Sequence, residues 1–172
     1  MRTETKIVKI YEFSELDKEV QEKLIDNKIE EIHNVYLEVY LEDDMEWEAI
    51  ELLNKYFKNQ KPTFKRVLYD LSYVQGRGAM FEFDLYYYNK LVHIKNYGHY
   101  THSRSFIISD DFQLTEKQEE QLKNKIIAMF EELEKIGDGL IEYVPSKDEA
   151  IEDLERYEYL SDGEVYDEIL PF

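Results

Sequence analysis

Apolar and polar residues alternate along the middle of the chain, where two stretches rich in aromatic and β-branched residues flank a glycine-rich segment. Residues 64–74 and 79–88 therefore predict two strands joined by a hairpin. A three-residue loop at residues 76–78 places the apolar side chains of both strands on one face, and Gly78 can adopt the left-handed conformation that such loops need. A two-residue loop would mix apolar and acidic side chains on that face. The three-residue loop pairs Val67 with Tyr87, Tyr69 with Leu85, Leu71 with Phe83 and Tyr73 with Phe81.

The same alternation predicts two further strands. A tight turn at Asn89-Lys90 opens the first of them, because Asn accepts a positive φ at moderate cost. Residues 104–109 form a short fourth strand, which completes an antiparallel meander with one core face and one polar face. The predicted pairs are Val92 with Tyr87 and Ile94 with Leu85 on the apolar face, and Lys95 with Asp84 and His93 with Tyr86 on the polar face.

Both flanks of the meander show the three- and four-residue spacing of amphipathic helices. Residues 6–13 predict a strand, and Ser14 is expected to cap a long helix. The acidic run at residues 42–44 should interrupt this helix. A second helix should then continue to Lys61-Pro62, and its apolar positions are Trp47, Ile50, Leu53 and Phe57.

On the C-terminal side, Thr115–Gln118 has the pattern of a capping box. The helix that it opens should stop at residues 137–139, and Ser146 and Ser161 mark two further helix starts. The expected fold class is α+β: an antiparallel β-meander of about four to five strands with helices packed on one face. We expect a single domain over residues 1–172, with a strand and helices at 1–60, the meander at 61–109 and acidic helices at 110–172.

Charge is distributed unevenly along the chain, which holds 39 acidic and 21 basic residues and has a net charge of −18. Residues 14–60 hold 14 acids and 5 bases, and residues 110–172 hold 20 acids and 6 bases, whereas residues 61–109 hold 3 acids and 7 bases. An acidic surface disfavours direct binding to nucleic acids or to anionic membranes. We therefore expect a basic protein as the partner.

Three acidic residues could carry chemistry on the polar face of the meander. Asp70, Glu82 and Asp84 share that face in the predicted register, with Asp70 opposite Asp84. Paired carboxylates can act as acid and base or hold a metal. An ion pair between Lys95 and Asp84 is the simpler interpretation.

Histidines and the glycine-rich loop offer two weaker candidates. His93, His99 and His102 could gather around a metal ion, but they lack a recognised ligand spacing. Arg77 and the glycines beside it could cradle a phosphate, although the loop has neither a Walker nor a dinucleotide-binding form. We expect no cofactor, no metal and no catalytic residue.

Composition favours an intracellular protein. The chain has no cysteine and therefore gives no sign of a disulfide framework. No apolar run approaches the ~18 residues of a membrane span, and no signal-like stretch follows Met1. We expect a cytoplasmic location in a host cell, without membrane association.

Four short motifs occur in order: Tyr-Glu-Phe-Ser-Glu-Leu at residues 11–16, Leu-Ser-Tyr-Val-Gln-Gly-Arg-Gly-Ala-Met-Phe at 71–81, Gly-His-Tyr-Thr-His at 98–102 and Tyr-Glu-Tyr-Leu-Ser at 157–161. Together they resemble a family of small acidic phage and prophage proteins. That family usually reads Ser-Gln-Gly-Asp-Gly at the hairpin, whereas Val74 and Arg77 replace the Ser and the Asp here, which argues against an acid-dependent role of the loop. The resemblance implies an origin in a mobile element and an association with anti-CRISPR and other anti-defence inhibitors. It supplies no enzyme activity.

These observations predict an anti-CRISPR-like inhibitor that binds a basic host protein, such as a CRISPR effector, by acidic mimicry of nucleic acid. The alternatives are a small nucleotide- or metal-binding enzyme that uses the hairpin loop and the polar sheet face, and an antitoxin-like neutralising partner. A solvated acidic surface would give the same pattern. The expected contact residues are Arg77, exposed at the hairpin tip, and the acids Asp43, Asp44, Glu48, Glu51, Glu149, Glu152, Asp153 and Glu155.

Overall fold

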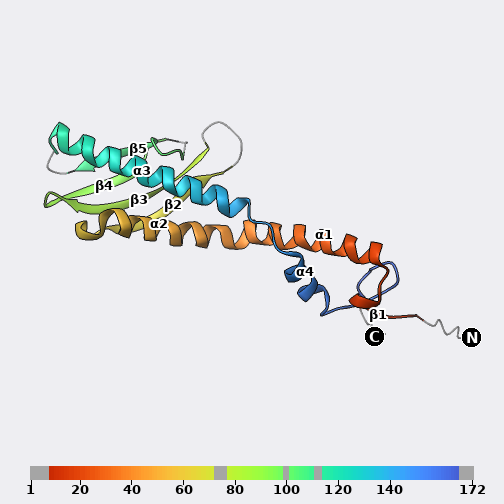
Figure 1. Ribbon diagram of the computed structural model, residues 1–172. Coiled ribbons are helices and arrows are strands. Elements are labelled where there is room, and N and C mark those ends of the chain that lie inside the picture. The colour runs from red at the N-terminus through yellow and green to blue at the C-terminus, as the bar shows by residue number, and fades with distance from the viewer. Residues whose placement is uncertain (1–7, 72–76, 99–100, 111–113, 167–172) are drawn as a thin grey trace, which may run out of the picture. The chain divides into compact units, whose positions relative to one another are not determined.

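The computed structural model describes residues 8–71, 77–98, 101–110 and 114–166. The chain divides into two compact units (Figure 1). The terminal unit combines Met1–Glu38 with Val144–Phe172, and the sheet unit comprises Val39–Tyr143. The expectation that residues 1–172 act as a single domain stays a prediction.

The sheet unit contains the predicted meander. Its strands are β2 (Thr63–Asp70), β3 (Gly78–Tyr87), β4 (Lys90–Asn96) and β5 (Phe106–Asp110), which pair antiparallel in the order β2-β3-β4-β5. Helices α2 (Leu41–Phe57) and α3 (Glu116–Ile141) pack on one face of this sheet (Figure 1). The predicted α+β class, with an antiparallel meander and helices on one face, is confirmed.

Aromatic rings fill the space between the sheet and its two helices. Phe83 of β3 lies 5.7 Å from Phe57 of α2, and Phe81 lies 5.1 Å from Phe130 of α3, measured between ring centroids. None of these four side chains is exposed to solvent. Tilted and edge-to-face aromatic pairs add about 0.5–1.5 kcal/mol each to the burial of their area. The predicted apolar face of β3 is therefore the core face.

The hairpin between β2 and β3 has a different register from the predicted one. Val67 pairs with Phe81 rather than with Tyr87, a shift of six residues, and Asp70 pairs with Gly78. An even shift keeps the same side chains on the buried face. The connection spans residues 71–77, so the predicted turn at 76–78 is wrong.

Contacts with α3 hold both ends of this longer connection. Leu71 is buried against Gly137, where an added Cβ would lie 3.0 Å from Leu71 Cδ1. Arg77 forms an ion pair with Asp138. Gly137 therefore provides close packing inside α3 and does not end the helix, which corrects the predicted stop at 137–139. Tyr73, predicted on the buried face, lies outside the described residues.

The turn between β3 and β4 is displaced by one residue from its predicted place. Tyr88 and Asn89 have φ values of 49° and 61°, the two left-handed residues of a type I′ turn. Lys90 already belongs to β4, so the predicted Asn89-Lys90 turn is wrong. The observed pairs are Phe83 with Ile94, Asp84 with His93, Leu85 with Val92 and Tyr86 with Leu91.

The terminal unit is a small α+β cluster. Strands β1 (Tyr11–Glu12) and β6 (Glu158–Tyr159) pair antiparallel, and α1 (Lys18–Val35) packs against α4 (Lys147–Leu154). Its buried residues include Phe13, Leu16, Leu154 and Tyr159.

Several predicted helix boundaries are corrected in the terminal unit. The strand predicted at residues 6–13 covers only Tyr11–Glu12 among the described residues, and Ser14 lies in a 3₁₀ turn while Asp17 stands at the N-cap of α1. The helix start predicted at Ser161 is a turn, in which Gly163 has a φ of 89°. By contrast, the predicted start at Ser146 is confirmed, because its hydroxyl accepts a hydrogen bond from the Glu149 backbone N–H at 3.2 Å.

Two boundaries of the central helices also differ from expectation. A π-helical turn at Tyr36–Tyr40 replaces the break predicted at residues 42–44, and those acids occupy the first turn of α2, where the helix dipole favours negative charge. A 3₁₀ turn (Lys58–Gln60) follows α2 before β2 begins. The capping box of α3 is confirmed, since Thr115 Oγ1 accepts from the Gln118 N–H at 3.3 Å and Gln118 Oε1 accepts from the Thr115 N–H at 3.1 Å.

Replacing Phe83 with Ala should lower the free energy of unfolding by about 3–5 kcal/mol, because the change leaves a cavity among buried rings. Tyr86 is a matched control on the opposite face of β3, where half of its surface (50%) is exposed. Its replacement by Ala should cost less than ~1 kcal/mol. Urea unfolding of both variants measures the difference, and equal losses would contradict the assigned faces.

Candidate functional site

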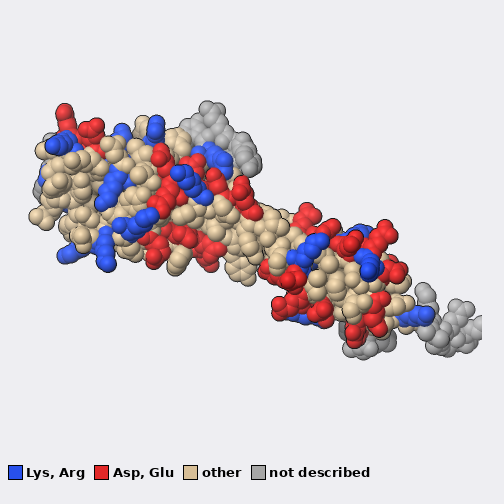
Figure 2. Space-filling model, in the orientation of Figure 1, with Lys and Arg blue, Asp and Glu red and all other residues tan. Residues whose placement is uncertain are grey.

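On the face that Figure 2 shows, acidic side chains occur on both units, with Lys and Arg interspersed among them. The terminal unit holds 20 acids and 8 bases, and the sheet unit holds 19 acids and 13 bases. Both units are therefore net acidic. The basic excess predicted for residues 61–109 is balanced within the sheet unit by the acids of α2 and α3.

The predicted contact acids of α2 differ in their exposure. Asp43 and Glu51 are exposed, whereas Asp44 and Glu48 are half-buried. Glu46, which is not among the predicted contact residues, is also exposed. The outer side of α2 therefore presents an acidic surface that includes Asp43, Glu46 and Glu51.

Trp47 lies on this outer side, contrary to its predicted place in the apolar stripe. It is 61% exposed, while Met45 and Ala49 are fully buried. Trp47 is two positions along the helix from each of these buried residues, and a step of two positions amounts to about 200° of rotation around the helix axis. The buried spacing of Met45, Ala49 and Leu52 was the sequence signal that would have placed Trp47 outside.

The predicted contact acids of α4 include one that serves the fold. Asp153 Oδ2 lies 2.6 Å from Lys28 Nζ on α1, and Lys28 is largely buried. Partial burial lowers the pKa of Lys28, but hydrogen bonds to Asp153 and Glu31 outweigh it and leave that pKa raised. Asp153 therefore helps to join α1 to α4, whereas Glu149, Glu152 and Glu155 are exposed.

Arg77 is not the exposed tip that the sequence predicts. Its side chain is 28% exposed and forms an ion pair with Asp138 of α3. Replacing Arg77 would therefore remove a contact between the β2–β3 connection and α3. A role for Arg77 in binding a partner stays a prediction.

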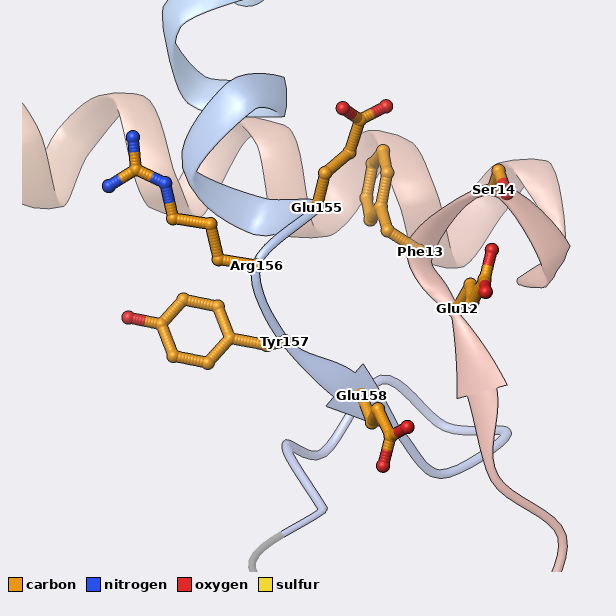
Figure 3. A pocket seen from close by; sticks show the side chains of 7 residues that line it. All are labelled: Glu12, Phe13, Ser14, Glu155, Arg156, Tyr157 and Glu158. Atoms are coloured by element: carbon orange, nitrogen blue, oxygen red, sulfur yellow. The ribbon is translucent and has the colours of Figure 1, made fainter.

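A pocket of about 410 Å³ lies in the terminal unit between the segments 12–14 and 155–158 (Figure 3). Three carboxylates line it, from Glu12, Glu155 and Glu158, together with the Ser14 hydroxyl and Arg156. The Arg156 guanidinium forms ion pairs with Asp153 at 3.3 Å and with Glu152 at 3.6 Å, both on α4. The lining thus favours positively charged groups.

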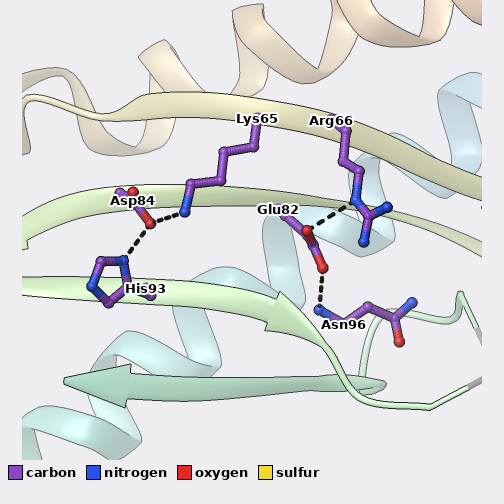
Figure 4. A network of polar contacts seen from close by, with 6 residues as sticks. All are labelled: Lys65, Arg66, Glu82, Asp84, His93 and Asn96. Carbon is purple, nitrogen blue, oxygen red and sulfur yellow. Dashed lines mark hydrogen bonds and ion pairs between the residues drawn. The ribbon is translucent and has the colours of Figure 1, made fainter.

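The polar face of the sheet carries two ion-pair clusters (Figure 4). Asp84 Oδ1 lies 2.7 Å from Lys65 Nζ on β2 and 2.6 Å from His93 Nδ1 on β4. Glu82 accepts a hydrogen bond from Arg66 Nε on β2 at 2.9 Å. Its other carboxylate oxygen accepts one from the backbone N–H of Asn96 on β4 at 3.0 Å. Each carboxylate of β3 is therefore held from both neighbouring strands.

These contacts lower the pKa of both carboxylates. Partial burial raises the pKa of Asp84, but hydrogen bonds and charges from Lys65 and His93 together outweigh it and bring that pKa below its ordinary value. The Arg66 hydrogen bond is the main cause of the lowered pKa of Glu82. Both groups are ionised at neutral pH, and each forms an ion pair with a cation of β2, Lys65 or Arg66.

The predicted pair of Asp70 with Asp84 does not form. Thr63 lies opposite Asp84 on β2, and Asp70 lies opposite Gly78. His93 rather than Lys95 lies opposite Asp84, because β4 is shifted by two residues relative to its predicted register against β3. The predicted Lys95–Asp84 ion pair is therefore wrong, and Asp84 instead forms a cross-strand ion pair with Lys65 and a hydrogen bond with His93.

The predicted histidine cluster is only partly described. His99 lies outside the described residues, His93 binds Asp84, and the His102 ring lies 3.0 Å from Ser105 Oγ. Within the described part of the chain, no group of three or more His, Cys, Asp and Glu residues is placed to hold a metal ion. The same residues include no helix with an apolar stretch long enough to cross a membrane.

Acid should destabilise the sheet unit through Glu82 and Asp84. Their pKa values are lower in the folded state than in the unfolded state, so their contribution to stability is present above about pH 4 and is lost as the pH falls through the folded values. The double change Glu82→Gln with Asp84→Asn should therefore lose less stability between about pH 5 and 3 than the wild type. Urea unfolding followed by near-ultraviolet circular dichroism measures this slope.

Glu120→Gln, on the exposed side of α3, is the matched control and should reproduce the wild-type slope. The ion-pair account is contradicted if the double variant and the wild type have parallel profiles.

Comparison of the chain with family models, with curated proteins and with solved structures found no match. The resemblance to small acidic phage proteins therefore stays a prediction.

Proposed function

We propose that the protein is an anti-defence inhibitor that binds a basic, nucleic-acid-handling host protein, such as a CRISPR effector, by presenting carboxylates in place of phosphates. The observation that supports this proposal most is the charge along α2. Residues 42–51 hold six acids and no base. Four of these acids, Glu42, Asp43, Glu46 and Glu51, are exposed.

The density of this charge is close to that of nucleic acid. At 1.5 Å of rise per residue, residues 42–51 extend over about 14 Å, so one exposed carboxylate occurs per roughly 3–4 Å of helix axis. A single strand of DNA carries one charge per ~3.4 Å. A basic groove that accepts DNA can therefore meet a comparable number of charges over the same length.

Internal pairing supports the same proposal. The two carboxylates of β3 form ion pairs with Lys65 and Arg66, whereas most acids on the outer sides of α1 and α2 are exposed. Negative charge that stabilises the fold is thus separated from negative charge that faces solvent. The cost of concentrating solvent-facing carboxylates, through their mutual repulsion, favours a positively charged partner.

Two matched charge reversals test the proposal. The α2 reversal changes Asp43, Glu46 and Glu51 to Lys, and the α1 reversal changes Glu22, Asp26 and Glu30 to Lys. All six residues are exposed, and the two reversals alter net charge equally. Asp153 is avoided because it pairs with Lys28.

The measurement is competition between the protein and labelled DNA or guide RNA for each of a panel of purified CRISPR effectors, at about 50 and 300 mM salt. Wild-type protein should displace the nucleic acid from an effector, less strongly at high salt, and at least one reversal should weaken displacement by roughly ten-fold or more. Exposed single acids are each worth only about 0.2–1 kcal/mol, so Glu51→Gln alone should have little effect. No displacement from any effector, or displacement that neither salt nor either reversal changes, would overturn the proposal.

A further inference from the structure

Three large apolar side chains are exposed at the start of α2 and in the turn before it. Val39, Tyr40 and Trp47 are 58%, 53% and 61% exposed. Trp47 is the single tryptophan of the chain. Burying an aromatic side chain of this size removes roughly 150–250 Å² of its surface from water, so a partner that covers Trp47 gains a large apolar contact.

Helix spacing places exposed carboxylates beside Trp47. Asp43 and Glu51 lie four residues before and after it, and side chains four residues apart are neighbours on a helix surface. Glu46 is adjacent in sequence and exposed. The opposite side of α2 is buried through Met45, Ala49, Leu52, Leu53 and Phe57, so the side that bears Trp47 is the outer one.

Charge decides which occupant this outer face fits. Residues 39–54 contain six acids and no base. A second copy of the chain would bring the same negative face to it, and nucleic acid would bring phosphates, so both are repelled. A polypeptide with Arg or Lys side chains is attracted, since carboxylates bind these groups through charge-assisted hydrogen bonds and an indole face attracts cations.

We propose that the outer face of α2, with Trp47 at its centre and Asp43, Glu46 and Glu51 around it, is the docking surface for a basic amphipathic segment of a protein partner. This inference rests on the proposed function and assigns its contact face. The arrangement has the form of a binding hot spot, in which a buried aromatic anchor contributes most of the energy and the surrounding polar groups contribute specificity.

A synthetic peptide serves as the probe. It is an amphipathic helix of about 18 residues with Arg on one side and Leu on the other, and its comparison peptides carry Gln in place of Arg or Ala in place of Leu. The parent peptide should bind and shift the fluorescence of Trp47 to shorter wavelength, since the indole leaves water. Both comparison peptides should bind at least roughly ten-fold more weakly.

Variants of the protein are compared by the anisotropy of the labelled parent peptide at about 150 mM salt. Trp47→Ala and the α2 reversal should each weaken binding by roughly ten-fold or more. Tyr97→Ala removes an aromatic side chain that is 71% exposed after β4 and should change binding by less than about two-fold, as should the α1 reversal. Each variant should keep the circular dichroism of the wild type, because all the altered side chains are exposed.

Other occupants are tested in parallel. Sedimentation should show no self-association that Trp47→Ala abolishes, and a labelled single-stranded DNA of about 20 nucleotides should not bind. Three outcomes would overturn the proposed docking surface: self-association that Trp47→Ala abolishes, binding of the single-stranded DNA, or equal peptide binding by Trp47→Ala and the wild type.

The two proposals fail in different ways. If the α1 reversal prevents displacement of nucleic acid from an effector and the α2 reversal does not, this inference is overturned and the proposed function stands. If no effector is inhibited but the peptide still binds through Trp47, the proposed function is overturned and the docking surface stands.

Discussion

The packing of Phe81 and Phe83 between the sheet and its helices determines on which face the two carboxylates of β3 lie. These two rings contact Phe57 of α2 and Phe130 of α3 and are fully buried. Because side chains alternate along β3, Glu82 and Asp84 must face away from the helices. On that face, ion pairs with the neighbouring strands hold them. The burial of the apolar side chains of β3 therefore determines which of its side chains lie on the polar face.

The same packing leaves the outer sides of the helices as the acidic surface. Met45, Ala49 and Leu52 bury one side of α2, and Glu46, Trp47 and Glu51 face solvent on the other side. The combination of an exposed indole with carboxylates is what distinguishes α2 from α1, whose exposed side is acidic but bears no aromatic side chain among its exposed large hydrophobic residues. This difference is the physical basis for choosing α2 as the contact face.

Alternation of side chains predicted the buried face of the meander, because face depends on whether residue numbers are odd or even and survives an even shift of register. The register itself depended on contacts distant in sequence. Leu71 and Arg77 attach the β2–β3 connection to Gly137 and Asp138, and no local pattern contains that information. Lys65 was missed as a partner of Asp84 because the β2–β3 register is set by these distant contacts, and His93 was missed because the β3–β4 turn lies one residue earlier than predicted. Trp47 was misplaced for a local reason, since a large apolar residue was assigned to the core although Met45 and Ala49 already defined the buried side.

Hydrogen exchange of the complex with the basic amphipathic peptide tests the central claim most directly, namely that the outer face of α2 is where a basic partner binds. The peptide should slow exchange of the backbone amides in residues 39–54 and leave exchange of the amides of β3 and β4 unchanged. Protection of β3 and β4 around His93, with no change in α2, would contradict it.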